Sequence, residues 1–563
     1  MREGIDHRPG GAPARGRGHP NPWLVLLVLC MGFFMILLDT TIVNIAIPSI
    51  IDGLHASLDS ILWVLNAYIL VYAVLLITAG RLGDLFGPRN LFATGLVIFT
   101  LASAACGLAQ TANELIVGRV VQGVGGALLT PQTLAILTTI FPPDRRGAAF
   151  GVWGGVAGIA AVTGPTLGGL LVSKISWQSI FYVNVPIGIV ALILTFLIVP
   201  DIRPGRRHRL DVLGVVLASA GLFGVVFGLI EGQRFNWGAI WGPIDIAEVI
   251  AAGVVLFLLF LLWERVQKGE PLVPLSIFRN RNFSVMNWIS VVMAFGMLGL
   301  FLPLTIYLQS VLGFSALKAG LTFAPMSGTS MLVAPFAGRL VDRIGGKYIL
   351  MSGLTCFAAG MGTVAWVASV NSDWYYFTGP LVLAGLGMGC IFAPLATVAM
   401  RDITPQLAGA ASGILNTTRQ VGAAMGSSLV GAVLQNRLAT SLHDQAVQHA
   451  GQIPAGFRAQ FVSGFSHAAS SGFQVGRGQT GGARLPADVP PHIVAQLQSV
   501  FHAVFVRAFV DAMRPTLGVA IIVLLVGALS CTLIRRRRRP DSEAAGTARD
   551  RDRPGELTPA GGP

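Results

Sequence analysis

The sequence predicts an all-α integral membrane protein with fourteen transmembrane helices, arranged as six, two and six. Three observations lead to this prediction. The composition is strongly apolar, and the chain contains many apolar windows of about 20 residues, the length that crosses a bilayer as a helix. A ten-residue motif also occurs twice, each time directly after a predicted span.

The composition argues against a soluble protein of this length. Of 563 residues, 53% are hydrophobic and only 12% are charged, and the mean hydropathy is +0.69. Much of the net charge of +13 is Arg in short connectors and in the run 535–539. Membrane orientation explains this excess more simply than nucleic-acid binding, so no nucleic-acid partner is expected. Five cysteines stand singly in apolar runs, without a disulfide pattern or metal-ligand spacing: Cys30, Cys106, Cys356, Cys390 and Cys531.

The connectors between the spans set the orientation. Those after even-numbered spans hold sixteen Lys and Arg residues, and the short ones after odd-numbered spans hold three. Because positively charged connectors stay in the cytoplasm, both termini of this multi-pass protein of the cell membrane are predicted to be cytoplasmic. The predicted spans are 23–47, 61–80, 91–109, 114–138, 148–172, 180–199, 211–230, 243–263, 284–309, 318–338, 348–368, 377–399, 409–433 and 515–534.

An internal repeat fixes the domain organisation. Residues 80–89, GRLGDLFGPR, return as residues 338–347, GRLVDRIGGK, the first after span 2 and the second after span 10. Two six-span halves related by a parallel repeat follow only if two spans are inserted between them. The predicted segments are a disordered N-terminus 1–22, an N-terminal half 23–199, two inserted helices with connectors 200–283, the first five helices of the C-terminal half 284–433, an external loop 434–514, a last helix 515–534 and a cytoplasmic tail 535–563.

The external loop 434–514 is polar, but its last part is amphipathic. Apolar residues recur at helical spacing from Ile493 to Ala508, against polar residues from Gln498 to Asp511. This pattern predicts a helix that either lies on the outer membrane interface or packs on the bundle before the last span.

Two charges lie well inside spans of the N-terminal half. Asp39 stands in span 1, beside Thr40, Thr41 and Asn44, and Arg119 stands in span 4. A charge at the centre of a membrane helix costs about 2.5 to 3.5 kcal/mol on insertion scales, so we expect these two side chains to face the bundle interior and to pair. A carboxylate held between burial and an arginine can take up a proton when the cation moves away. A permanent structural ion pair, or helix association through hydrogen bonds, is the alternative.

The loop after span 2 and the whole of span 5 contain residues that predict close contacts between helices. Asp84 stands in the tight turn from Gly83 to Gly87, where its carboxylate can cap a neighbouring helix N-terminus and meet Arg89. Span 5 is rich in glycine and contains Pro165, so we expect a bend there and a close approach by another helix. Such packing can seal one mouth of a pathway, but a generic small-residue packing face fits the spacing equally well.

Aromatic and amide side chains near these motifs suit an apolar pocket with a few polar groups, although core packing is the alternative for each of them. No nucleophile-and-base pair and no metal-ligand cluster is evident, so we expect neither an enzyme nor a cofactor or metal site. The candidate substrate-cavity residues are Trp63, Asn66, Tyr68, Gln122, Trp153, Tyr307, Asn416 and Gln420.

The chain resembles the major facilitator superfamily, and within it the branch of fourteen-span drug:proton antiporters. Residues 38–48, LDTTIVNIAIP, are similar to a signature of that branch, and the repeated motif resembles the family signature between spans 2 and 3. Residues 119–126, RVVQGVGG, resemble the family's arginine motif, and residues 158–169, GIAAVTGPTLGG, resemble its antiporter motif. Secondary matches lie at 181–188 and 416–422.

The resemblance implies the major facilitator fold and export by alternating access between the two halves, driven by proton antiport. It also assigns roles to three groups of residues. These are proton coupling at Asp39 and Arg119; a gating latch of Gly80, Asp84, Gly87, Arg89 and, in the repeat, Asp342; and the antiporter motif of Gly158, Gly164, Pro165 and Gly168.

We therefore expect an exporter that moves amphipathic small molecules such as drugs, antibiotics and dyes across the cytoplasmic membrane in exchange for protons. The sequence does not identify an adaptor protein. The alternatives are an exporter of a lipid or an endogenous metabolite, and a receptor or scaffold on the same fold that would lack proton-linked transport.

Overall fold

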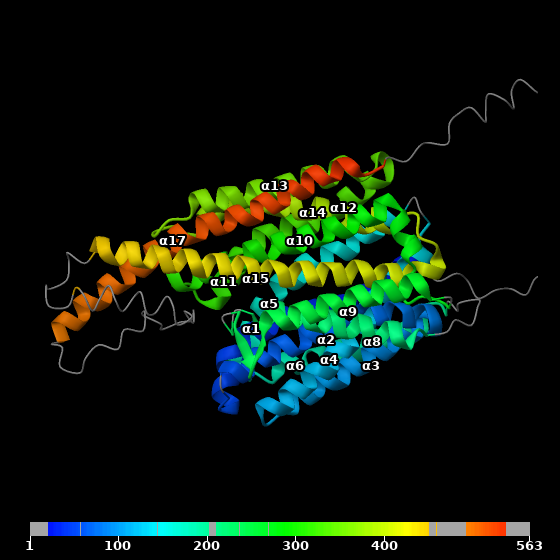
Figure 1. Ribbon diagram of the computed structural model, residues 1–563, viewed down its shortest axis with the longest axis horizontal. Coiled ribbons are helices and arrows are strands. Elements are labelled where there is room, and N and C mark those ends of the chain that lie inside the picture. The colour runs from blue at the N-terminus through cyan, green and yellow to red at the C-terminus, as the bar shows by residue number, and fades with distance from the viewer. Residues whose placement is uncertain are drawn as a thin grey trace, which may run out of the picture.

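The computed structural model describes residues 21–56, 58–142, 145–201, 210–232, 234–235, 237–267, 269–449, 458 and 491–535. These residues fold almost entirely into long helices (Figure 1). Figure 1 shows the first helices of the chain, in blue, on one side of the molecule and the last helices, in green to red, on the other. We call these two groups of helices the N-terminal half and the C-terminal half.

The N-terminal half is built from α1 to α7. Its first helix begins at Pro22, after Asn21, whose side-chain oxygen accepts a hydrogen bond from the Trp23 amide at 3.0 Å. Proline suits this position because the first helical amide has no partner within the helix. The helices are α1 (Pro22–Leu54), α2 (Leu58–Phe86), α3 (Pro88–Leu108), α4 (Ala112–Ile140), α5 (Arg146–Lys174), α6 (Ser179–Tyr182) and α7 (Asn184–Ile198).

Two inserted helices follow, α8 (Val212–Glu231) and α9 (Ile246–Val266). The predicted eighth span starts slightly too early, because β1 (Ala239–Trp241) and β2 (Ile244–Asp245) form a small antiparallel hairpin just before α9. α8 packs on α2, and α9 packs on the outer side of α8 with little of its surface buried.

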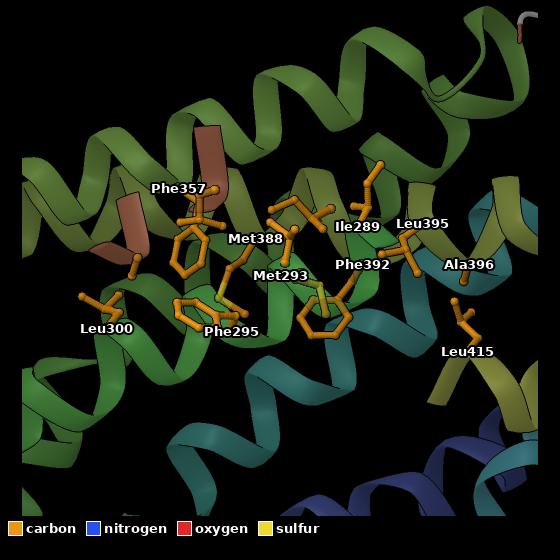
Figure 2. Packing of buried hydrophobic residues seen from close by; sticks show 14 of the residues in the cluster. Ile289, Met293, Phe295, Leu300, Phe357, Met388, Phe392, Leu395, Ala396 and Leu415 are labelled. Atoms are coloured by element: carbon orange, nitrogen blue, oxygen red, sulfur yellow. The ribbon is translucent and has the colours of Figure 1, made fainter. Parts of the chain in front are cut away.

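The C-terminal half is built from α10 to α17. Its apolar side chains form a continuous core, and Figure 2 shows Met293 of α10, Phe357 of α13 and Phe392 of α14 within it. α10 ends in a short π-helical segment, Tyr307–Val311. The helices are α10 (Arg281–Ile306), α11 (Ala316–Thr322), α12 (Ala324–Ile344), α13 (Lys347–Val367), α14 (Thr378–Met400), α15 (Ala408–His449) and α17 (Pro491–Ser530), with short 3-10 turns at Leu275–Arg279, Trp374–Phe377, Pro405–Leu407 and Cys531–Leu533.

All fourteen predicted spans fall on helices, but the number of membrane crossings stays a prediction. Among the described residues, eleven helices are long and apolar enough to cross a membrane. The other predicted spans, 148–172, 318–338 and 409–433, fall mainly on α5, α12 and α15, and the first residues of 318–338 belong to α11. Helices α5, α12 and α15 pack extensively on other helices. Their surfaces therefore need not be as apolar as those of helices that face lipid.

The two halves meet along two pairs of helices. α2 packs on α15, and α5 packs on α12; we call these contacts the first seam and the second seam. The inserted helix α8 lies beside the first seam, because the Ser428 hydroxyl of α15 donates to the Leu229 carbonyl of α8. Glu231, the last residue of α8, is buried and accepts a hydrogen bond from Asn66 of α2 at 2.9 Å. The inserted pair is thus attached to both halves.

Helices α15 and α17 are longer than a bilayer requires. At 1.5 Å per residue, 42 and 40 residues extend about 60 Å, twice the roughly 30 Å of a hydrocarbon core. Figure 1 shows both helices projecting together beyond the rest of the bundle. The segment 434–514 therefore begins and ends as continuations of its flanking helices, and the predicted amphipathic stretch belongs to α17. Buried apolar residues along the projecting pair include Leu438, Leu442 and Ala446 of α15 and Val504 and Phe505 of α17.

Candidate functional site

α1 and α4 bring the two charges of the N-terminal half together as a buried ion pair. Arg119 Nη1 lies 2.5 Å from Asp39 Oδ2, and neither residue is more than 1% exposed. Arg119 Nε also donates to the Val64 carbonyl at 3.1 Å. The guanidinium carbon lies 4.3 Å from the centre of the Tyr68 ring, so an aromatic face adds to the stabilisation of the cation.

Amide and hydroxyl side chains surround this ion pair. Gln122 Nε2 donates to Asp39 Oδ1 at 2.8 Å, and Gln122 Oε1 accepts from Arg119 Nη1 at 2.7 Å. Asn184 Nδ2 lies 3.5 Å from Asp39 Oδ1 and donates to Ser103 Oγ at 3.1 Å. We call these five residues the polar network, and all of them are buried. Both carboxylate oxygens have partners, which a buried charge requires.

Sequence reasoning missed two members of the polar network. Asn184 carried a faint signal, because it is an amide in an apolar helix and lies within the match at 181–188. Ser103 carried none, since small hydroxyl residues are common in membrane helices. Gln122, a predicted cavity residue, lies inside this network.

The polar network compensates both buried charges in this arrangement. If the guanidinium of Arg119 moved out of hydrogen-bond distance, the carboxyl group of Asp39 would be left in apolar surroundings without its cation, which is costly. Within the part of the chain that the structure describes, no three His, Cys, Asp or Glu side chains gather to hold a metal ion.

The first seam carries a carboxylate cap. Asp84, near the end of α2, accepts hydrogen bonds from the Gly409 and Ala410 amides at the start of α15, both at 3.0 Å. Unpaired amides at a helix N-terminus attract negative charge. Gly80, one turn earlier, lies so close to α15 that a Cβ there would overlap the Gly409 carbonyl oxygen. The cap and the glycine contact hold the same ends of α2 and α15 together.

The second seam repeats this arrangement with the halves exchanged. Asp342 of α12 accepts a hydrogen bond from the Gly147 amide at the start of α5 at 3.1 Å. A Cβ at Gly338 would overlap the Gly147 carbonyl oxygen. Each copy of the repeated motif therefore reaches across to the opposite half.

The turn in each copy of the motif requires glycine. Gly87 and Gly345 have φ values of 90° and 84°, in the region that side chains with a Cβ rarely adopt. Arg89, the next charged residue, lies 3.8 Å from Asp201 and donates to the Val199 carbonyl at 3.4 Å. This residue therefore fastens the turn to the end of α7.

The glycines of α5 allow two neighbouring helices to approach closely. A Cβ at Gly158 would lie 2.7 Å from the Ser327 carbonyl oxygen of α12, within the second seam. Gly164 and Gly168 instead face α1, where a Cβ would meet the Thr41 and Ile42 side chains. The side chain of Pro165 lies outside the described part of the chain. α5 therefore packs closely on both α12 and α1 through its small residues.

Two predicted cavity residues face the inserted helices. The Trp63 ring lies 6.0 Å from the Phe227 ring of α8, and Asn66 is bound to Glu231. Gln420, on α15, is half-buried. Glu231 directly follows the predicted span 211–230, and the sequence pattern gives no sign that it is buried.

The remaining cavity candidates lie in other surroundings. Trp153 stacks on Phe33 at 4.3 Å between ring centres, and its buried indole nitrogen has no hydrogen-bond partner among the described residues. The Tyr307 hydroxyl donates to the Ser369 carbonyl at 2.6 Å. Asn416 donates to the backbone of its own helix at 2.9 Å. Several candidates therefore have partners within the protein.

Comparisons with known proteins agree with this architecture. The profile of the Major Facilitator Superfamily matches residues 29–427. An uncharacterised MFS-type transporter of Mycobacterium tuberculosis is 42% identical over 75% of this chain and 72% of its own length. A tetracenomycin C resistance and export protein of Streptomyces glaucescens is 37% identical over 78% and 80%, and a puromycin resistance protein of Streptomyces alboniger is 35% identical over 77% and 86%. The crystal structure of a human organic anion transporter aligns with a TM-score of 0.56 at 15% identity over 81% of this chain and 99% of that one, which supports the fold alone.

Proposed function

The chain belongs to the major facilitator superfamily, and we propose that it is a proton-coupled antiporter that exports amphipathic small molecules across the cytoplasmic membrane. Family membership makes it a multi-pass membrane transporter and not an enzyme. Its relatives include proteins named for antibiotic resistance and export, which supports outward transport of drugs and antibiotics.

The observation that carries the proton-coupling proposal is the buried ion pair of Asp39 and Arg119. Burial of two charges gives little net stability compared with apolar packing, so a purely structural role is weakly motivated. An ion pair that opens during the transport cycle would instead let Asp39 bind a proton in one state and release it in the other. Gln122 would keep the carboxylate oriented in both states, because it is bound to both partners.

The two seams support alternating access. In each seam a carboxylate and a glycine hold helices of opposite halves at the ends that the arginine distribution assigns to the cytoplasm. We propose that this arrangement is the cytoplasm-closed state, and that breaking both caps opens the cytoplasmic side. Gly80, Asp84, Gly87, Arg89 and Asp342 would then be parts of one latch.

We propose that the substrate binds between the halves, beside the helices that form the seams. Of the predicted cavity residues on those helices, Trp63 and Asn66 of α2 face α8, and Tyr68 of α2 lies against Arg119. This leaves Trp153 on α5 and Asn416 and Gln420 on α15 as the candidates between the halves. The indole N–H of Trp153 is a donor that a ligand can use when the halves part, because no described residue accepts from it in this state. Apolar and aromatic lining with few polar groups suits an amphipathic substrate.

The proposed orientation, with both termini in the cytoplasm, has a separate test. In a background without the five native cysteines, a cysteine placed at the exposed residue Gln110 should react with a membrane-impermeant maleimide added to intact cells. A cysteine at exposed Arg279 should react only after the membrane is permeabilised. The reverse pattern would invert the orientation.

The test of coupling is the variant Asp39→Asn, because an amide keeps the shape of the side chain and cannot titrate. In proteoliposomes with an imposed pH gradient, the unaltered protein should accumulate puromycin or a fluorescent amphipathic dye. D39N should accumulate no more than protein-free vesicles do, while it still exchanges substrate between equal concentrations on both sides. Asp52→Asn, an exposed site on the same helix, is the matched control and should retain accumulation.

Accumulation by D39N with an unchanged dependence on pH would remove Asp39 from the coupling step. Loss of both accumulation and equilibrium exchange in a well-folded D39N protein would assign the residue to substrate passage instead. Absence of any transport by the unaltered protein across a broad panel would favour a receptor or scaffold.

A further inference from the structure

A pocket of about 330 Å³ opens at the end of the second seam that carries the Asp342 cap. It is lined by residues from both halves: Trp23 of α1, Arg145 and Ala148 at the start of α5, and Arg339, Asp342 and Arg343 at the end of α12. None of these residues except Asp342 has a role in the mechanism proposed above. The volume is within the range of small-ligand sites in proteins.

The pocket is strongly positive. The charged lining residues are three arginines, Arg145, Arg339 and Arg343, and one aspartate. The aspartate, Asp342, already accepts a hydrogen bond from the Gly147 amide. Among the described residues, neither Arg339 nor Arg343 has a hydrogen bond or an ion pair. Guanidinium groups bind phosphate oxygens in bidentate geometry. These two arginines are therefore available to an anionic ligand.

The pocket also borders an apolar, outward-facing surface. On α12, Phe336 precedes Arg339 and Arg343 by one and two turns on the same side of the helix, and it is 67% exposed. Leu332, one turn before Phe336 on α12, is 66% exposed. Trp23 is exposed at the start of α1, as expected for a tryptophan at the membrane interface. A ligand with both a phosphate group and apolar chains fits the arginine-lined pocket and the adjacent apolar surface better than a free anion does.

We propose that this pocket binds the headgroup of an anionic phospholipid. The phosphodiester would lie between the Arg339 and Arg343 guanidinium groups with Arg145 opposite, and the acyl chains would pass over Phe336 and Leu332. The assignment of this lipid to the cytoplasmic leaflet rests on the proposed orientation. The binding site itself depends on neither proton coupling nor drug export.

A lipid bound here would also stabilise the closed second seam. Its binding residues lie on α1 and α5 of one half and on α12 of the other, so separating the halves pulls the pocket apart. A ligand that binds one state better shifts the population towards that state. Anionic lipid is thus expected to favour the arrangement in which Asp342 caps α5.

The binding test uses the full-length protein in a neutral detergent, titrated with short-chain phosphatidylglycerol. We expect saturable binding, and at least tenfold weaker binding of short-chain phosphatidylcholine and of inorganic phosphate. The double variant R339Q/R343Q should bind phosphatidylglycerol about thirtyfold more weakly, from roughly one kcal/mol per basic residue at a lipid surface. R265Q/R279Q removes the same charge from exposed residues outside the pocket and should bind as the unaltered protein does.

Three results would overturn the proposal. Equal weakening in R339Q/R343Q and R265Q/R279Q would mean general electrostatic attraction. Equal binding of phosphatidylcholine would remove the role of charge, and equal binding of inorganic phosphate would identify a free-anion site. R339K/R343K, which keeps the charge and loses the bidentate geometry, should bind with intermediate affinity and replaces the glutamine variant if that variant folds poorly.

The population shift has its own readout. Spin labels at Asn90 of the N-terminal half and Gln406 of the C-terminal half, both exposed, report the separation of the halves. In nanodiscs, replacing a third of the phosphatidylcholine by phosphatidylglycerol should increase the short-distance population in the unaltered protein and not in R339Q/R343Q. This measurement needs no substrate and no pH gradient, so its failure is distinguishable from a failure of the transport proposal.

Discussion

The N-terminal and C-terminal halves share their seam contacts but differ in their buried charges. Asp84 and Asp342 cap helices of opposite halves, and Gly80 and Gly338 make matching backbone contacts. In the N-terminal half, Asp39 and Arg119 are fully buried. In the described residues from 281 onward, by contrast, no Asp, Glu, Lys or Arg is buried.

The seams, which join the two halves, are therefore distinct from the polar network, which holds the buried ion pair. Both seams use a carboxylate cap and a close glycine contact. The two contacts together hold the halves in the observed arrangement, because each half contributes one cap to the other. A buried ion pair needs to exist once, since every buried charge carries a desolvation cost. The repeat therefore accounts for the seams, and the polar network is particular to one half.

The largest expected effect comes from removing the cation of the ion pair. Arg119→Gln leaves the buried Asp39 carboxylate uncompensated, so it should lower the free energy of unfolding by about 3 to 5 kcal/mol and abolish transport. The double variant D39N/R119Q leaves no unpaired charge and should recover much of the thermal stability in detergent without recovering pH-driven transport. If R119Q is as stable as the unaltered protein, the ion pair is not the charge-compensated unit described here.

A second prediction concerns the close glycine contacts in the seams, where adding one methyl group should push the two halves apart. Gly80→Ala and Gly338→Ala each place a Cβ against a backbone carbonyl of the opposite half, and crowding of this kind costs about 1 to 3 kcal/mol. Both variants should shift the Asn90–Gln406 spin-label distance towards longer values. Gly155→Ala is the matched control, because its Cβ would lie 3.6 Å from the nearest atom, an ordinary contact. A shift in G155A as large as in G338A would contradict the role of close backbone approach.

The smallest expected effect comes from weakening the cap of the first seam. Asp84 uses both carboxylate oxygens on two amides of α15. An asparagine has a single acceptor oxygen, so Asp84→Asn should weaken this cap by about 1 kcal/mol and slow turnover in proteoliposomes. Asp52→Asn, at an exposed site, is the control and should keep its turnover. Normal turnover in a well-folded D84N protein would remove Asp84 from the mechanism.

The sequence was most informative where burial is costly. Asp39 and Arg119 are charges within apolar spans, so the energetic penalty itself predicts that they meet. Asn184 and Ser103 impose no comparable penalty, and their place beside Asp39 depends on how α3 and α7 pack, which no local pattern records. The contact of Arg89 with Asp201 likewise joins residues far apart in the sequence.

The helix ends were predicted less well than the helices. α15 continues well beyond the expected end of its span, although Leu434, Leu438 and Leu442 recur at a helical interval that indicates such a continuation. The residues between these leucines are mostly polar, so the segment is not an apolar window of span length. Similarly, the amphipathic stretch before the last span was recognised, but its fusion with that span into α17 was not.

The length of α15 has a mechanical consequence. Its first residues receive the Asp84 cap, and its last turns belong to the pair that projects with α17. One helix of about 60 Å thus connects the cap to the far end of the projection. A tilt of about 10° around the capped end would carry His449 through roughly 10 Å, given that length. If the cap is released as proposed and α15 moves as one rigid helix, a label near His449 would register that release with greater amplitude than a label beside the cap itself.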